Sequence, residues 1–191
     1  MVVNLFSRRT TGAALPRRLR RLLPPGAQVL GAVPVRQDGT AWLVATTGHL
    51  LEVGEDTDGL RLAWGRVDRA SWDAAQRMLT VTPLHDPQPL TWAVPSALVR
   101  QEPDGRAVTL KVDERRFAHA LRQRVENAIV HHVTRLLEGG VRAVASVRRD
   151  ENGELYSTTD PLPEDPSAAG CRQALRDLER QVRQDVGLPT H

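Results

Sequence analysis

The sequence predicts an α+β protein, with an antiparallel β-barrel or sandwich of about seven strands, a long helix that closes it, a β-hairpin and a C-terminal helix. Short segments with alternating apolar residues follow one another from residue 28 to residue 112, separated by turn sequences. The apolar spacing then becomes helical over residues 113–138. Strand-like alternation returns at Val141 and is followed by one more amphipathic segment.

Turn residues divide the first region into short strands. Asp38-Gly39 and Asp104-Gly105 are dipeptides that favour tight hairpin turns. The segments that we expect to be strands are 28–35, 41–46, 49–53, 60–72, 78–84, 89–94 and 106–112. Most successive segments begin about 8–14 residues apart, a spacing typical of antiparallel sandwiches and barrels.

One continuous helix is expected from Asp113, which can cap its N-terminus, to Glu138. Gly139-Gly140 follows as a C-terminal stop. At 1.5 Å per residue this helix would be about 39 Å long, which exceeds the length needed to cover one sheet. We therefore expect its far end to pack on the C-terminal part of the chain.

The C-terminal part is expected to be a hairpin followed by a helix. Segments 141–149 and 154–159 alternate like strands and flank a turn sequence that ends in Gly153. Asp165 can cap the last helix, with Pro166 as its first residue. The apolar stripe of this helix is Cys171, Ala174, Leu175, Leu178, Val182 and Val186.

Charge separates a basic arm from the rest of the chain. Residues 1–37 carry seven arginines and no acid, whereas residues 38–191 carry 19 basic and 23 acidic residues. We expect residues 1–23 to be a basic, partly disordered arm with a short amphipathic helix over 13–23. Residues 24–138 then form the main domain, and residues 139–191 form an appendage packed on it.

A set of segments carries a resemblance to a known group of proteins. The segments are VLGAVPV (29–35), AWLVATTGHLLEV (41–53), VDRASWD (67–73), LTV (79–81), RQRVENAIV (122–130), VRAVASVRRDENGELY (141–156) and the closing helix. On these segments the chain resembles uncharacterised actinobacterial proteins with a pleckstrin-homology-like (PH-like) domain, over about residues 24–188. Tyr156 stands where a tryptophan is common in that group. The resemblance implies a PH-like β-barrel closed by a helix, and it implies no known activity.

Motifs for catalysis, metal binding and phosphate binding are absent from the sequence. There is no H-E-x-x-H, no G-x-S-x-G and no glycine-rich phosphate loop. Cys171 is the lone cysteine, so a four-cysteine zinc site and an internal disulfide are excluded. We therefore predict a bacterial, non-enzymatic protein that needs no cofactor or metal. An enzyme with an unfamiliar site is a further hypothesis.

The first functional hypothesis is a protein-interaction or scaffolding module. PH-like folds bind ligands at the open barrel end or in the groove between sheet and helix, which is an argument by analogy of fold. The helix face that we expect to line a partner groove carries Phe117, Leu121 and Val125. The sequence indicates no oligomeric state.

The alternative is peripheral binding of an anionic surface through the arm. Arg17, Arg18, Arg20 and Arg21 lie opposite a face of leucines in the expected short helix. Such a helix suits an anionic membrane surface, and less well nucleic acid. The opposite reading is that the leucines pack on the domain and the arginines are solvated. The lone cysteine and the lack of a secretory-signal pattern predict a cytoplasmic location, at most peripheral to the membrane.

Overall fold

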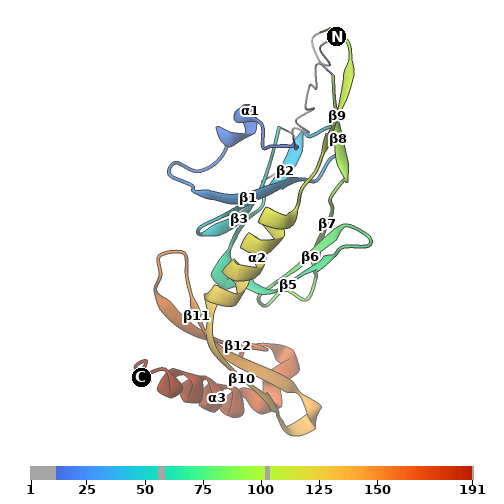
Figure 1. The fold of residues 1–191 in the computed structure, drawn as a ribbon. Helices are drawn as coiled ribbons and strands as arrows, with labels where there is room; N and C mark the ends of the chain where they lie inside the picture. The colour runs from blue at the N-terminus through green and yellow to red at the C-terminus, as the bar shows by residue number, and fades with distance from the viewer. Residues whose placement is uncertain (1–11, 56–58, 102–103, 191) are drawn as a thin grey trace, which may run out of the picture.

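The computed structural model describes residues 12–55, 59–101 and 104–190, and it is an α+β protein (Figure 1). All strand pairs in these residues are antiparallel. The buried apolar side chains form two clusters, one between Ala13 and Ala128 and one between Val133 and Leu188. We call residues 12–128 the body and residues 129–188 the C-terminal unit.

The described strands of the body form three sheets. The first has the order β1–β2–β3–β4, with β1 (Val29–Pro34), β2 (Ala41–Thr46), β3 (His49–Gly54) and β4 (Arg61–Ala63). The second consists of β5 (Val67–Asp73), β6 (Met78–Pro83) and β7 (Leu90–Ala93). The third pairs β8 (Ala97–Gln101) with β9 (Ala107–Lys111).

The predicted barrel of about seven strands is not closed among the described residues. The segment 60–72, expected as one strand, is interrupted by a 3-10 turn, η1 (Trp64–Arg66). Because of this turn, β4 pairs with β3 in the first sheet, whereas β5 pairs with β6 in the second. Strand β8 was not predicted from the sequence. It pairs with β9 in a separate two-stranded sheet.

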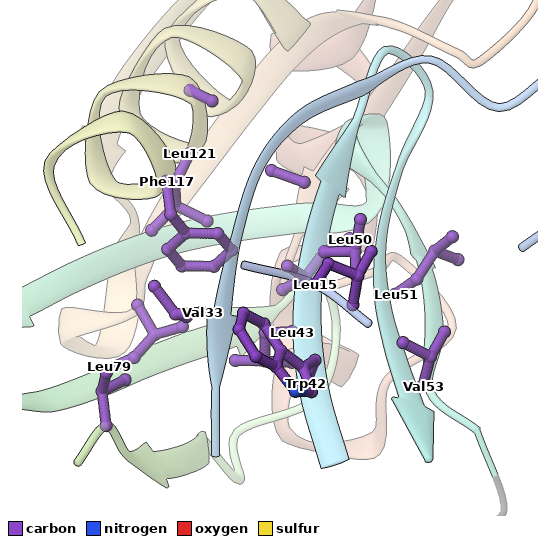
Figure 2. Close-up of a cluster of buried hydrophobic side chains, with 14 of the residues drawn as sticks. Leu15, Val33, Trp42, Leu43, Leu50, Leu51, Val53, Leu79, Phe117 and Leu121 are labelled. Carbon is purple, nitrogen blue, oxygen red and sulfur yellow. The ribbon is translucent and has the colours of Figure 1, made fainter. Parts of the chain in front are cut away.

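Helix α2 (Arg115–Ala128) packs across β1 and β5 and closes the core of the body. Figure 2 shows Phe117 and Leu121 pointing from this helix toward the strand residues Val33 and Leu79. The close approach depends on Gly31, because a Cβ there would lie 2.6 Å from the Cα of Phe117. Helix α2 begins one residue later than expected, with Glu114 and not Asp113 at its N-cap. Oδ1 of Asp113 still accepts the backbone N–H of Arg115 at 3.1 Å.

The prediction of one helix over residues 113–138 is wrong beyond Ala128. Residues Ile129–Leu136 form strand β10, which pairs with β11. Ile129 and Val133 are spaced four apart, so they satisfy a helical stripe as well as the alternation of a strand. The β-branched residues at 129, 130, 133 and 134 favour the strand. The helix therefore ends at Ala128 and not at Glu138.

The C-terminal unit is a three-stranded sheet covered on one face by a helix. Its elements are β10, η2 (Glu138–Gly140), β11 (Arg142–Arg149), β12 (Leu155–Asp160), η3 (Pro166–Cys171) and α3 (Arg172–Asp185). The predicted β11–β12 hairpin is confirmed. Asp165 does cap a helical segment, since its Oδ1 accepts from the backbone N–H of Ser167 at 2.8 Å, but that segment is η3. Helix α3 begins six residues later than expected, with Cys171 at its N-cap. No described helix has the length and apolar character needed to cross a bilayer.

Polar contacts join the body to the C-terminal unit. Tyr156 donates its hydroxyl to the Gly65 carbonyl at 2.7 Å, and Nη2 of Arg148 donates to the Val67 carbonyl at 2.9 Å. Nε2 of His85 lies 2.9 Å from the Thr158 hydroxyl oxygen. We call this region the junction. It lies on the sheet face that α3 leaves uncovered.

Burial at the junction makes His85 a pH-sensitive contact. Burial lowers the pKa of His85, an effect that Asp160 and Asp68 oppose and that Arg66 and Arg148 reinforce. Because the pKa is lower in the folded state, stability is full at neutral pH and is lost as pH falls below the unfolded value of about 6.5. We expect the free energy of unfolding to decrease between neutral and mildly acidic pH by less in His85→Gln than in the wild type.

Urea unfolding at a series of pH values measures this difference. The pKa of His49 is also lowered, mainly by burial, and His49 is present in both proteins, so their difference reports on His85. Identical pH dependence in the two proteins would show that the pKa of His85 is the same in the folded and unfolded states.

Candidate functional site

The described part of the arm, residues 12–23, returns along the body instead of extending into solvent. Helix α1 (Arg17–Arg20) is a single turn, and the backbone N–H of Ala13 donates to the Lys111 carbonyl at 2.8 Å. Leu15 and Leu19 are buried in the core of the body, whereas Leu22 is 55% exposed. Much of the apolar side of the arm is therefore used inside the protein. Residues 1–11, part of the predicted basic arm, lie outside the described residues.

The arm leaves a groove of about 940 Å³ along the edge of the first sheet. The groove is lined by arm residues 13–15, 20 and 23, by the loop 24–27 that follows, by residues 29–32 of β1, and by the start of α2. Strand β1 is the outer strand of its sheet and pairs with β2 alone among the described strands. Pro34 at its end is tolerated because an outer strand has backbone positions that need no partner.

Positive charge surrounds this groove. Arg20 reaches it from the arm, and Arg115 and Arg116 reach it from the start of α2. All three side chains are exposed and form no ion pair with a described residue. Asp113 is the one acidic residue in the described lining, and it already accepts the backbone N–H of Arg115. An anionic ligand would meet little repulsion here.

The arginines predicted from the sequence lie beside this groove, but they do not all line it. Arg17, Arg18, Arg20 and Arg21 are exposed, and Arg20 alone of the four contributes to the lining. Arg18 pairs with Glu55 at 3.3 Å, and both side chains are about half exposed, so this pair contributes little to stability.

The helix face predicted to bind a partner is filled by the protein's own core. Phe117 and Leu121 are 1% and 4% exposed, and Val125 is half-buried against the same cluster. These three side chains hold α2 on the sheets and do not line an open groove. The open groove lies at the N-terminal end of the same helix, around Arg115 and Arg116. Sequence reasoning missed this pair, although adjacent exposed arginines at a helix start were visible as a signal.

Metal-ligating side chains do not gather in the described part of the chain. No group of three or more His, Cys, Asp or Glu residues there could hold an ion. His131 faces Asp185 at 3.1 Å between Nε2 and Oδ2, and its neighbour His132 points to the other side of β10. Cys171 is buried, and its thiol donates to the Glu138 carbonyl at 3.4 Å.

Comparison with protein families, curated proteins and solved structures finds no match to this chain. The resemblance to PH-like proteins therefore rests on the sequence segments alone. The function has to be argued from the groove and its charges.

Proposed function

We propose that this chain is a non-enzymatic, cytoplasmic interaction module that binds an acidic, extended segment of a partner protein in the groove beside β1. The observation that carries the proposal is the placement of Arg20, Arg115 and Arg116 around an open groove that follows an outer strand. An extended segment can add to such an edge through backbone hydrogen bonds, while side-chain contacts select the sequence. The arginines favour carboxylates at these side-chain positions.

We include in the proposal a distant PH-like relationship, which the sequence segments suggest and which no comparison tests. Its antiparallel sheets are followed by one helix, α2, which packs across β1 and β5. A PH-like domain likewise places one helix after its antiparallel strands, although its barrel has about seven strands and the body has nine described strands in three sheets, so the likeness is an analogy of fold. It carries no residue roles to this chain.

The second candidate is binding of an anionic membrane surface or nucleic acid through Arg17, Arg18, Arg20 and Arg21. Exposure of all four guanidinium groups favours it. Against a membrane role, Leu15 and Leu19 are buried, so Leu22 and the half-buried Leu23 are the leucines left for insertion in the described part of the arm. Electrostatic attraction without apolar insertion gives weak, salt-sensitive binding. An acidic protein segment is the better match to a groove that combines charge with apolar walls.

Charge reversal at the start of α2 tests the proposal. The probe is a fluorescent peptide of alternating glutamate and valine, and its binding is followed by fluorescence anisotropy. We expect the double variant Arg115→Glu/Arg116→Glu to bind this peptide at least about tenfold more weakly, because two attractive charges become repulsive. The matched control is Arg172→Glu/Arg176→Glu on the exposed side of α3, which should bind like the wild type.

Three further probes separate the candidates. A peptide of alternating lysine and valine should not bind the wild type. Anionic vesicles and duplex DNA should bind more weakly than the acidic peptide at physiological salt. Strong binding of vesicles or DNA, lost in a variant with all four arm arginines changed to alanine, would replace the proposal with the second candidate. Equal peptide binding by both double variants would refute the groove as the site.

A further inference from the structure

The C-terminal sheet has a polar face that α3 does not cover. Helix α3 packs on the face that carries Ala143, Ala145 and Val147. Alternation along β11 therefore places Arg142, Val144, Ser146 and Arg148 on the opposite face. The strand register adds His132 and Thr158, which lie on either side of Ser146. Six neighbouring positions thus form a polar surface that faces the body.

A cavity of about 300 Å³ lies at the junction between this face and strand β5. Arg142, Ser146 and Arg148 line it from β11, and Thr158 lines it from β12. Arg69 and Asp68 line it from the body. This volume is at the small end of the range found for ligand pockets. Both units of the protein therefore contribute to one small polar cavity.

Arg148 is the unusual member of this lining. Its side chain is 2% exposed, and Nη2 donates to the Val67 carbonyl. Its Nε is buried and has no hydrogen-bond partner. No carboxylate in the described chain forms an ion pair with it. A buried guanidinium without a counter-ion is costly, because burial removes water that the hydrogen bond to the Val67 carbonyl replaces only in part.

The remaining charges around the cavity do not neutralise Arg148. Arg69 and Arg142 add two more guanidinium groups, and Asp68 and Asp160 add two carboxylates. Neither aspartate forms an ion pair with an arginine among the described residues. Burial lowers the pKa of Arg148, and the smaller effects of Tyr156 and Asp68, which raise it, do not cancel this decrease. The lining keeps an excess of positive charge around a buried, incompletely bonded donor.

We propose that the junction cavity binds a phosphate group, either free or as the monoester of a small molecule. Three arginines and the hydroxyl groups of Ser146 and Thr158 supply donors from two strands and from the body. A carboxylate presents two oxygens in one plane, whereas a phosphate presents oxygens in several directions and carries more negative charge. The phosphate therefore makes fuller use of donors that surround it. The neighbouring Thr159 pairs with Ala145, so its hydroxyl lies on the α3 face of the sheet and is not one of these donors.

A bound phosphate would connect the two units. Arg69 belongs to the body, whereas Arg142, Ser146 and Arg148 belong to the C-terminal unit. A ligand that binds only the assembled junction stabilises the folded protein by mass action. The ligand therefore raises the melting temperature of the full chain.

Isothermal titration calorimetry and thermal unfolding of the full chain test the site. The probes are inorganic phosphate, glycerol phosphate, acetate and chloride at constant ionic strength, with phosphatidic acid vesicles as the membrane form of the same group. We expect one molecule of phosphate or glycerol phosphate per chain and a higher melting temperature. Acetate and chloride should have little effect. Binding of vesicles but not of soluble phosphates would identify a lipid headgroup as the source.

Arginine variants locate the binding. Arg69→Gln and Arg142→Gln alter exposed side chains and should fold, and each should weaken phosphate binding about tenfold. Arg148→Met keeps an apolar stem without the buried charge and should abolish binding while the chain remains folded. The control Arg172→Gln on α3 should bind like the wild type.

The proposal is overturned if phosphate does not saturate one site, or if Arg172→Gln weakens binding as much as Arg142→Gln. The groove variant Arg115→Glu/Arg116→Glu should retain phosphate binding. If the wild type binds phosphate but not the acidic peptide, the groove proposal fails and the cavity proposal stands. If it binds the peptide but not phosphate, the cavity proposal fails and the groove proposal stands.

Discussion

Replacement of Gly31 by alanine should cost about 2–3 kcal/mol of the free energy of unfolding. The added Cβ would lie 2.6 Å from the Cα of Phe117 and 2.8 Å from its backbone nitrogen. Both contacts are with backbone atoms, so a change of side-chain rotamer cannot relieve them. Helix α2 would have to move away from β1, and Phe117 would leave a core in which it is almost fully buried.

The measurement is urea unfolding followed by tryptophan fluorescence. All four tryptophans lie in the body, so this signal reports on the unit that α2 closes. Gly170→Ala is the matched control, because no atom lies within 4 Å of the Cβ it would add. The control should change stability by no more than about 0.5 kcal/mol. Similar stabilities for the two variants would show that α2 can shift on β1 at little cost.

The local features of this fold were readable from the sequence. Glycine and aspartate mark hairpin turns, and Gly39 and Gly105 adopt the positive φ angles, 72° and 80°, that such turns require. The C-terminal helical segment combines a clear cap at Asp165, which begins η3, with a regular apolar stripe along α3. In these segments the residue types and the periodicity favour the same structure.

The errors arose where the sequence fits two structures. Residues 129–136 satisfy both helical and strand periodicity, and pairing with β11 decides for the strand. The break at Trp64–Arg66 depends on Gly65, which lets the Arg149 carbonyl approach to 2.7 Å from the position of a Cβ. That contact joins residues far apart in the chain, so no local pattern could reveal it.

Both proposed sites depend on such long-range contacts. Arg148 follows the polar alternation of β11, which the sequence shows, and alternation alone favours solvent exposure on that face. It is buried only because the body docks onto the C-terminal sheet. The groove likewise exists because Leu15 and Leu19 bring the arm back beside α2. The predicted face at Phe117 and Leu121 was correctly apolar, but the protein's own core uses it.

The second large effect is expected in the C-terminal unit. Leu178 lies on α3, is fully buried, and packs in a cluster of seven buried residues with Ala143, Ala145 and Val147. Leu178→Ala should cost about 2–5 kcal/mol in that unit, because so small a cluster has few other apolar contacts to replace the lost ones. The tryptophan-monitored transition of the body should change much less.

We expect Leu178→Ala to destabilise mainly the C-terminal unit because the two hydrophobic clusters are separate. Contacts across the junction include the hydrogen bonds made by Tyr156, Arg148 and His85, whereas the apolar cores on either side are distinct. Hydrogen exchange read by mass spectrometry measures the effect, with faster exchange expected in α3 and β11 than in β2 and β3. The control Leu136→Ala removes the same atoms from a side chain that is 72% exposed, and it should change exchange little. Equal acceleration in both units would instead show that the junction makes the whole chain one cooperative structure, and phosphate at the junction would then stabilise every element alike.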